Sequence, residues 1–391
     1  MGILHIERLG IGKLSINITH IITGLHTGGA ERSLFNVINY SPDRINHSVI
    51  SLSELGHYGD LLKKSGFSVY SLDARAGFGR WKALFRLWSL VRRLNPDIIQ
   101  GWMHHGNLAA LLVGLLRPGA AIGWNVRQSI DALPREKRGT RWAIAMQRLL
   151  AHIPDVIIYN SHRSREQHEA YGYSSRRSRV IPNGFDTKRW RPDAARRSEW
   201  RDRIGRTPDD LLIGYVGRFH PMKAIPNFLE ACCAAMDTSQ NLHVAMVGEE
   251  LSEENAELID AIAPDKRDRF SLLGRRPDVE NILPAFDIFC LSSGHSEAFP
   301  NVLGEAMASG LPCIATDVGD SARVMGGHGL IVPPGDISKL VEAMVAMAEM
   351  DVACRAEIGK AARARIEACY SLQVTVDAYI ELYDSMMKRD D

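Results

Sequence analysis

The sequence has no long hydrophobic run and almost no net charge, +1 over 391 residues. No stretch approaches the roughly 18 apolar residues that a membrane-spanning helix needs. The best candidate, residues 108–116, is short and interrupted by glycine, so we expect a buried helix there. Hydrophobic residues make up 45% of the chain, which excludes a disordered protein. The 33 glycines follow no fixed period, which excludes a collagen-like chain.

Cysteine is also scarce, and its pattern excludes two kinds of site. The six cysteines form no C-x-x-C pair and no cluster with histidine, so neither a disulfide framework nor a metal site is expected. Cys290 and Cys313 stand in apolar runs and are expected to be buried free thiols of a reducing compartment. Residues 1–12 lack the pattern of a signal peptide, which favours a cytoplasmic protein.

The small net charge hides a strong asymmetry between the halves of the chain. Residues 1–190 carry 26 Lys/Arg and 13 Asp/Glu, a balance of +13, whereas residues 191–391 carry 21 and 33, a balance of −12. A basic half favours a phosphate-bearing or membrane-surface partner. The alternative is that the two halves simply attract each other.

Short apolar runs alternate with longer amphipathic stretches, which predicts parallel sheets covered by helices on both faces. The expected strands form two runs of six: residues 16–22, 48–52, 69–72, 97–100, 122–126 and 156–160, then 211–216, 243–247, 270–273, 288–291, 312–315 and 329–332. The turn-rich segment 181–192 interrupts this alternation and is the candidate linker. The prediction is an α/β chain of two Rossmann-like, doubly wound domains, residues 1–183 and 184–373. Ligands of such folds bind at the carboxyl ends of the strands, here in a central cleft.

Three loops after predicted strands could bind a ligand. The first, residues 23–32, contains Gly28 and Gly29 before a helix, where an anion could approach the backbone, although a plain strand–helix turn is equally possible. The second, residues 216–223, places Arg218 and Lys223 five residues apart. Together they could hold a diphosphate, or they could be two solvated cations.

The third loop, residues 292–313, carries the strongest signal. Glu297 lies in the loop, Pro300 suits the first turn of a helix, and Gly310 with Pro312 marks its end. Glu305 lies within that helix, where its carboxylate could accept two hydrogen bonds from a ribose diol. Free amides from Phe299 to Val302 could receive phosphate oxygens.

In their order along the chain these pieces resemble a retaining glycosyltransferase of family four with the GT-B fold, similar to the sugar transferases of polysaccharide and lipopolysaccharide synthesis. The resemblance covers nearly the whole chain. The matching pieces are Gly28–Arg32, Pro96–Ile99, Val180–Asp186, Gly217–Phe219 with Lys223, Val247–Glu249, the pair Glu297 and Glu305, and Ala315–Gly319.

The resemblance implies a role for each candidate residue. Arg218 and Lys223 would bind the donor diphosphate, Glu305 the ribose, and Glu297 would lie beside the transferred sugar. Further residues would contribute backbone donors or line the nucleotide: Ala298, Phe299, Pro300, Asn301, Val302 and Leu303. The loop with Gly28 and Gly29 would reach across from the first domain, and a helix at about 374–391 would pack back onto it.

The sequence departs from the family pattern at three positions. Ala224 and Ala298 stand where the family usually has glycine, and Arg323 stands where it often has a carboxylate. The histidine that usually follows the fourth strand could be His104 or His105, and we favour His105 as the group beside the transferred sugar or the acceptor. The alternative is a packed histidine of the wall.

The expected reaction moves a sugar from a nucleotide-diphosphate sugar, UDP-linked, to a saccharide or a lipid-linked saccharide. No D-x-D cluster appears in a suitable loop, so we expect no metal and no other cofactor, with cations and helix amides stabilising the leaving diphosphate. No nucleophile is evident below the sugar, which favours attack from the face of the leaving group. The alternatives are a nucleotide-sugar epimerase of the same fold and a non-catalytic sugar-nucleotide or glycan-binding module at the membrane.

The acceptor is expected to lie against the basic half. Residues 75–93 form an amphipathic, basic, Trp-bearing stretch typical of a helix on an anionic membrane, unless their Trp residues belong to the core. A second basic patch consists of Arg135, Lys137, Arg138 and Arg141. Nucleic acid is not expected, because the aromatic residues do not interleave with the cations as stacking platforms.

Overall fold

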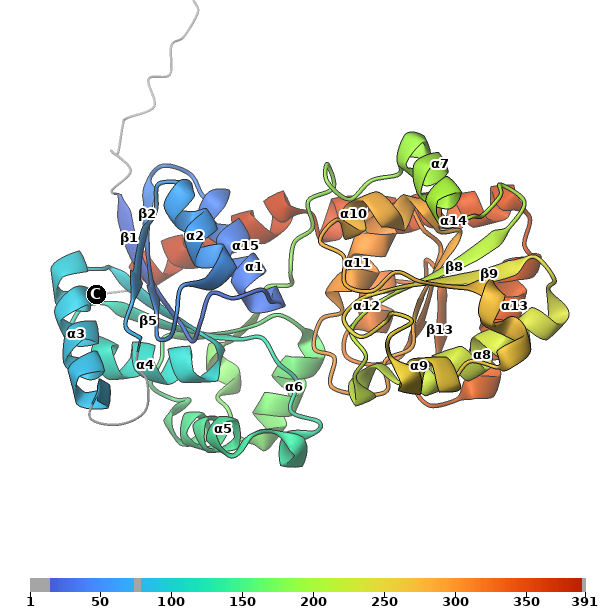
Figure 1. Ribbon diagram of the computed structural model, residues 1–391. Coiled ribbons are helices and arrows are strands. Elements are labelled where there is room, and N and C mark those ends of the chain that lie inside the picture. Colours follow the sequence, from blue (N-terminus) through green and yellow to red (C-terminus); the bar gives the residue numbers. More distant parts are fainter. Residues whose placement is uncertain (1–14, 74–78, 389–391) are drawn as a thin grey trace, which may run out of the picture. The chain divides into compact units, whose positions relative to one another are not determined.

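The computed structural model describes residues 15–73 and 79–388, apart from the side chains of residues 79–81 and 135. Two parallel sheets carry the fold, and Figure 1 shows helices on both faces of each. The first sheet has the order β3-β2-β1-β4-β5-β6-β7 and the second the order β10-β9-β8-β11-β12-β13. Residues 1–12, where no signal peptide is expected, lie outside the described part.

All twelve predicted strands are present. The first sheet consists of β1 (Ile16–Ile22), β2 (Ile45–Ser51), β3 (Ser68–Ser71), β4 (Ile98–Trp102), β5 (Ala121–Val126), β6 (Val156–Tyr159) and β7 (Ser178–Val180). The second consists of β8 (Leu211–Val216), β9 (Leu242–Val247), β10 (Phe270–Leu272), β11 (Ile288–Leu291), β12 (Cys313–Thr316) and β13 (Leu330–Val332). Only β7 was not predicted; it is three residues long and pairs with β6 at the edge of its sheet.

Helices fill the connections between the strands. They are α1 (Gly29–Asn39), α2 (Gly56–Lys64), α3 (Gly79–Leu94), α4 (Met103–Leu115), α5 (Arg138–Leu150), α6 (His162–Tyr171), α7 (Ala194–Arg203), α8 (Ile225–Thr238), α9 (Ala256–Asp260), α10 (Val279–Ile282), α11 (Asn301–Ala308), α12 (Ser321–Met325), α13 (Ile337–Glu349), α14 (Val352–Cys369) and α15 (Leu372–Met387). Short 3-10 turns are η1 (Leu133–Arg135), η2 (Ser175–Arg177), η3 (Pro221–Lys223), η4 (Pro264–Arg269) and η5 (Leu283–Ala285). No described helix is both long and apolar enough to cross a bilayer.

The chain divides into two compact units. One contains Met1–Trp124, Ile153–Val156 and Ile380–Asp391, and the other Asn125–His152 and Ile157–Tyr379. The end of α15 belongs to the first unit, where the Tyr383 hydroxyl donates to Gln100 at 2.5 Å and Arg44 pairs with Asp384 at 2.7 Å. The predicted linker, residues 181–192, contains no helix or strand. A domain boundary at residue 183 stays a prediction.

The second sheet is buried on both faces, because alternate residues of each strand face opposite layers. On β11, Phe289 and Leu291 join the cluster formed with α11, α12 and α14, whereas Ile288 and Cys290 join the cluster formed with α8, α9 and α13. Cys290 and Cys313 are buried free thiols, as predicted, whereas Cys354 and Cys369 are exposed.

Helix α4 is less buried than its sequence predicts. Ala110 and Val113 pack against the first sheet with residues of α3. Leu112, Leu115 and Leu116 are exposed instead, so the expectation of a buried helix over residues 108–116 is wrong for its outer side. The run contains too few polar residues to show which side faces water.

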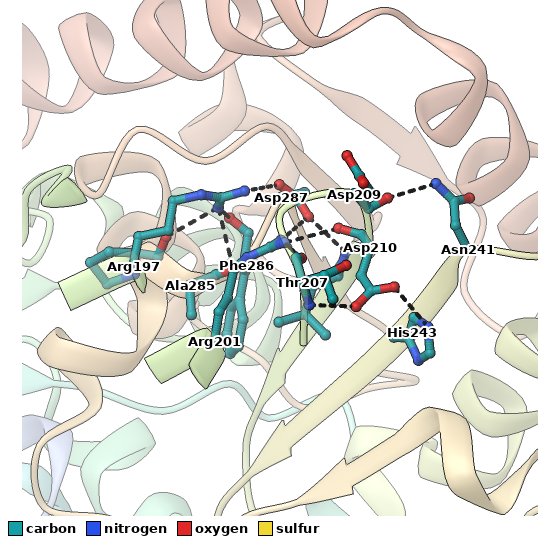
Figure 2. Close-up of polar contacts among 12 residues, drawn as sticks. Arg197, Arg201, Thr207, Asp209, Asp210, Asn241, His243, Ala285, Phe286 and Asp287 are labelled. Carbon is teal, nitrogen blue, oxygen red and sulfur yellow. Dashed lines mark hydrogen bonds and ion pairs between the residues drawn. The ribbon is translucent and has the colours of Figure 1, made fainter. Parts of the chain in front are cut away.

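A polar network ties the amino ends of β8 and β11 to α7, as Figure 2 shows. The Asp287 carboxylate accepts from the guanidinium groups of Arg197 and Arg201 and, at 2.7 Å, from the backbone N–H of Leu212. Arg201 also donates to the carbonyl oxygens of Thr207 and Ala285. Arg201 is buried, so these partners offset the cost of removing its charge from water.

Two buried histidines of the first sheet, His20 on β1 and His47 on β2, take part in a chain of hydrogen bonds. The Trp102 indole can only donate, and it lies 3.1 Å from Nδ1 of His20. His20 Nδ1 is therefore the acceptor, and its Nε2–H donates to Nδ1 of His47 at 2.9 Å. This order leaves the hydrogen on Nε2 of His47, a buried atom that has no partner among the described residues.

We predict that stability falls in acid because of this pair. Burial lowers the pKa of His47 from 6.5 to about 4, and the pKa of His20 is also lowered, by burial and by His47. The unfolded chain therefore binds more protons than the folded chain between these values. The contribution is complete above pH 6.5 and is lost toward pH 4, by about 3 kcal/mol for His47 alone. Urea unfolding at stepped pH measures the loss.

Control variants separate the contribution of His47 to the pH dependence from that of carboxylates that titrate in the same pH range. His47→Gln keeps a hydrogen-bond acceptor for His20 and should make the pH dependence between 6.5 and 4 shallower, with the part due to His20 remaining. His57→Gln, a change at an exposed histidine on α2, should leave it as in the original protein. An equal slope in all three proteins would contradict the prediction.

Candidate functional site

Two loops at the carboxyl ends of neighbouring strands form the centre of the candidate site. Strands β8 and β11 are adjacent in the second sheet, so residues 217–224 and 292–300 leave the same edge. The Ser292 hydroxyl donates to the carbonyl oxygen of Lys223 at 2.9 Å. The N–H of Gly294 donates to the carbonyl oxygen of Met222 at 2.8 Å. The two loops are therefore fixed to each other through their backbones.

The structure brings the predicted Lys223 and Glu297 into direct contact. The Lys223 ammonium donates to Oε1 of Glu297, which also accepts from the Ser293 hydroxyl at 2.8 Å. The Lys223 side chain is 13% exposed and that of Glu297 is 11% exposed. Because both charges are largely removed from water, each depends on the other for compensation. Spacing alone did not predict this pairing.

Arg218 has a different environment. It is exposed, and its guanidinium lies 3.9 Å from the sulfur of Met222. No carboxylate partner is present for it among the described residues. Arg218 thus remains able to bind an incoming anion, whereas Lys223 already has a carboxylate partner.

The helix predicted after Pro300 is α11, with Pro300 at its N-cap. The backbone N–H groups of Phe299, Asn301 and Val302 have no acceptor among the described residues. The first N–H groups of a helix have no partner within it and favour an anion. This end of α11 therefore offers amide donors close in sequence to Glu297 and Ala298.

Several predicted contact residues turn their side chains into the core. The Phe299 ring packs near the rings of Phe185 and Tyr370, with centroids 6.0 and 5.8 Å apart. Leu303 is fully buried, while Val302 is half-buried. A Cβ at Gly304 would lie 2.1 Å from Phe185, so glycine allows this packing. At Phe299 and Leu303 only the backbone remains for a ligand.

Glu305 is 6% exposed, so it is not an ordinary surface residue of the helix. It lies one turn after Asn301, and its backbone carbonyl accepts from Ser309 at 2.9 Å. The side-chain amide of Asn301 accepts from Asn183 at 2.6 Å and thereby anchors the first turn of α11. These contacts fix the backbone that carries the Glu305 carboxylate.

The loop after β12 supports the Glu297–Ala298 backbone. Gly319 has φ 62, and a Cβ there would lie 2.4 Å from the carbonyl oxygen of Glu297. The N–H of Asp320 donates to the carbonyl oxygen of Ala298 at 3.2 Å. The Asp320 carboxylate accepts from the first N–H groups of α6. The sequence predicts a role for the segment that contains Gly319 but gives no signal for Asp320.

Asp131 was also missed, although it holds the residue before Glu297. Ser296 has φ 61, a strained conformation for a residue with a side chain. Its N–H donates to the Asp131 carboxylate at 2.9 Å, and its hydroxyl lies 3.2 Å away. Burial alone would raise the pKa of Asp131, but the hydrogen bonds from Ser296, Ser129 and Ala132 hold it below its ordinary value. Asp131 thus positions Glu297 through Ser296.

The remaining predicted residues belong to the other unit. Gly28 is the N-cap of α1 and Gly29 its first residue, so the predicted turn into a helix is present. On α4, His104 is buried and His105 is exposed. Partial desolvation lowers the pKa of His105, which keeps its imidazole neutral at neutral pH. His105 is thus the exposed one of the two histidines, and its place beside the sugar or the acceptor stays a prediction.

The next feature is the arrangement of side chains that could bind a metal ion. Within residues 15–73 and 79–388, no group of three or more His, Cys, Asp or Glu side chains is placed to bind a metal ion. The cation in contact with Glu297 is Lys223.

One further feature distinguishes this site, the backbone of Ala224. It lies between Lys223 and α8 with φ 47 and ψ 43, in the left-handed region that favours glycine. Alanine therefore keeps a glycine-like conformation at this position and bears the strain.

Two family models match successive parts of the chain. Residues 27–189 match "Glycosyltransferase Family 4", and residues 210–350 match "Glycosyl transferases group 1". The fold agrees with that of solved GT-B glycosyltransferases. The crystal structure of Anabaena HepE in complex with UDP superposes with a TM-score of 0.81 at 20% identity, over 95% of this chain and 100% of that one.

The relatives found by sequence are more similar in identity, but most of them match only part of this chain. The lipopolysaccharide core biosynthesis mannosyltransferase LpsB of Rhizobium meliloti is 26% identical over 293 residues, 68% of this chain and 80% of LpsB. D-inositol 3-phosphate glycosyltransferase of Nocardia farcinica is 29% identical over 217 residues, 52% of this chain. The match spans about half of that relative, 47% of its length.

We predict that Ala224→Gly stabilises the protein. Glycine adopts the left-handed conformation without the Cβ clash, so the free energy of unfolding should rise by roughly 1 kcal/mol. Urea or thermal unfolding measures the change. Ala234→Gly, within the regular helix α8, is the matched control and should lower stability by about the same amount. Destabilisation by both changes would show that Ala224 bears no strain.

Proposed function

The chain belongs to the family 4 glycosyltransferases, and we propose that it moves a sugar from a UDP-linked donor to a saccharide acceptor with retention of anomeric configuration. The acceptor is a saccharide or a lipid-linked saccharide in the synthesis of a cell-surface polysaccharide. The names of LpsB and of the UDP-bound HepE support this choice of pathway and nucleotide. The observation that carries the proposal is the Lys223–Glu297 contact beside the free amides of α11.

The leaving diphosphate defines what the site must do. During transfer the bond between the anomeric carbon and the diphosphate oxygen breaks, and negative charge grows on that oxygen. Lys223, Arg218 and the N–H groups at the start of α11 are donors that can stabilise this charge in place. This chemistry does not require a metal, and we propose that the enzyme is metal-independent and uses no cofactor.

The carboxylates have separate roles in this proposal. Glu305 accepts hydrogen bonds from the ribose diol, and buried placement on a fixed helix suits that task. Glu297 lies beside the transferred sugar and orients Lys223 toward the diphosphate. In this proposal Gly28, Gly29, His104 and His105 of the other unit also contribute to substrate binding, with His105 beside the transferred sugar or the acceptor. The backbone N–H groups of Ala298, Phe299 and Asn301 contribute donors, whereas Pro300 has no N–H and is the N-cap of α11.

Retention follows from attack on the face that the diphosphate leaves. The acceptor hydroxyl oxygen forms the new bond to the anomeric carbon, and its proton passes to the departing diphosphate oxygen. Both bonds then lie on one face of the sugar, and no enzyme nucleophile is needed. Glu305 is not an acid catalyst in this scheme, so the two-carboxylate logic of glycosidases does not apply.

We predict that UDP binds at this site and stabilises the protein. At about 100 times its dissociation constant, UDP should add roughly 2.7 kcal/mol, measured by thermal shift in the presence of EDTA. The paired change Lys223→Met with Glu297→Gln removes both charges without leaving one unpaired and should abolish the shift. Lys339→Met, a change at an exposed lysine of α13, is the control.

Glu305→Gln should weaken the binding of UDP about tenfold while leaving the response to inorganic diphosphate unchanged, because only the ribose contact is lost.

A donor-dependent extension of a saccharide would separate transfer from epimerisation, which extends nothing. The assignment fails if no uridine or guanosine diphosphate compound shifts the melting temperature, or if EDTA abolishes the shift.

We also propose that the protein acts at the cytoplasmic face of an anionic membrane. Leu87 and Val91 of α3 pack in the core, whereas Phe85 is 66% exposed among Lys82 and Arg86. An exposed apolar ring flanked by cations suits anionic lipid. Trp88 is half-buried beneath Arg92, and residues 74–78 lie outside the described part.

The prediction is binding to phosphatidylglycerol vesicles in a flotation assay, stronger than to phosphatidylcholine vesicles and weaker at high salt. Phe85→Ser should lower the floated fraction several-fold, because it removes apolar area from the contact. Val352→Ser, on an exposed valine of α14, is the control. Equal flotation with both lipids would exclude this surface as an anionic-membrane contact.

A further inference from the structure

A concave surface lies outside the residues assigned to the donor. It is a groove of about 490 Å³ between η1, α5 and the end of α6. Arg138, Arg141, Trp142 and Tyr171 line it, with Leu133 and Pro134 from η1. Its volume falls within the range of small-molecule sites, whereas a flat bilayer surface does not fill a concavity.

The charge of this groove is positive and uncompensated. Helix α5, with the sequence RGTRWAIAMQRLL, contains no Asp or Glu. Arg138 and Arg141 are exposed and have no carboxylate partner among the described residues. The nearest acidic residue in sequence, Glu136, already accepts from the Gln128 amide at 2.6 Å. The two guanidinium groups are therefore available to an anion from solvent.

The aromatic side chains add a second kind of contact. Trp142 is 61% exposed although it stands on a regular helix. Tyr171 is half-buried, and the Arg148 guanidinium lies over its ring, 5.2 Å from the centroid. Aromatic rings offer an apolar face to the C–H groups of a sugar ring. Arginine offers paired donors that match a phosphate or carboxylate.

We propose that this groove binds an anionic saccharide, a sugar unit that bears a phosphate or a carboxylate. Trp142 stacks on the sugar ring, and Arg138 and Arg141 bind the anionic group. The inference rests on the proposed function, in which this unit is part of the acceptor. It deepens that function by giving the acceptor a charge. The phosphate could belong to a lipid-linked diphosphate and the carboxylate to an acidic sugar, and both present the same chemistry to the groove.

The test is a titration of the full chain, without donor, by isothermal calorimetry or ligand-observed NMR. The probes are α-glucose 1-phosphate, glucuronate, methyl α-glucoside and inorganic phosphate. The expected result is that the two charged sugars bind at least tenfold more tightly than the neutral sugar and than phosphate alone. Which charged sugar binds better distinguishes the two sources of charge.

Variants then locate the binding. Arg138→Ala and Arg141→Ala should each weaken the charged sugars about tenfold and reduce the salt dependence. Trp142→Ala should weaken sugar binding and leave phosphate binding unchanged. Lys360→Ala removes one exposed charge from α14 and should change nothing. Circular dichroism confirms that each variant folds.

Three results would overturn the inference. The first is equal affinity for charged and neutral sugars, and the second is unchanged affinity in the arginine variants. The third is no binding of any soluble sugar together with Arg138-dependent binding of phosphatidylglycerol vesicles, which would make the groove a membrane contact. UDP titration of the same variants keeps the two hypotheses apart. If the original protein does not bind UDP, the proposed function is contradicted. If it binds UDP but does not prefer charged sugars, only the inference about the groove is contradicted.

Discussion

The contact between Lys223 and Glu297 is the interaction on which the candidate site depends. Each charge is largely removed from water, and each would be costly without the other. The pair can form only because β8 and β11 are neighbours and their loops are bonded through Ser292 and Gly294. A change that separates the loops would therefore leave both buried charges without a partner. It would also disturb the anion site.

The two ends of the same strands have different physical character. At the amino ends of β8 and β11, the Asp287 carboxylate accepts from two arginines and from a backbone N–H. At the carboxyl ends, Ala224 and Ser296 hold left-handed conformations and the first amides of α11 lack acceptors. The hydrogen bonds at the amino ends stabilise the sheet. They thereby offset the backbone strain and the unpaired amides at its carboxyl ends.

The strands were predictable because burial on both faces leaves unbroken apolar runs, as in Ile288–Leu291. Strand β7 escaped because Ser-Arg-Val is short and polar at an edge. The residue types of the site were also predictable, since Lys223, Glu297 and Glu305 follow strands or begin helices. Their contacts were not, because Lys223 and Glu297 are 74 residues apart and only strand order brings them together. Alanine and serine gave no signal of a left-handed backbone, and nothing in the sequence marks Asp131 as a partner of Ser296.

The two positive regions differ in how they attract an anion. Lys223 is already paired, so its charge is largely cancelled until a ligand supplies other partners, and a weakly bound anion gains little there. Arg138 and Arg141 are unpaired, and their field extends into solvent within the screening length of the salt. A paired cation favours a ligand that fits several contacts at once, as a nucleotide sugar does. Unpaired arginines attract any anion, so selectivity in the groove must come from the shape and stacking that Trp142 and Tyr171 supply.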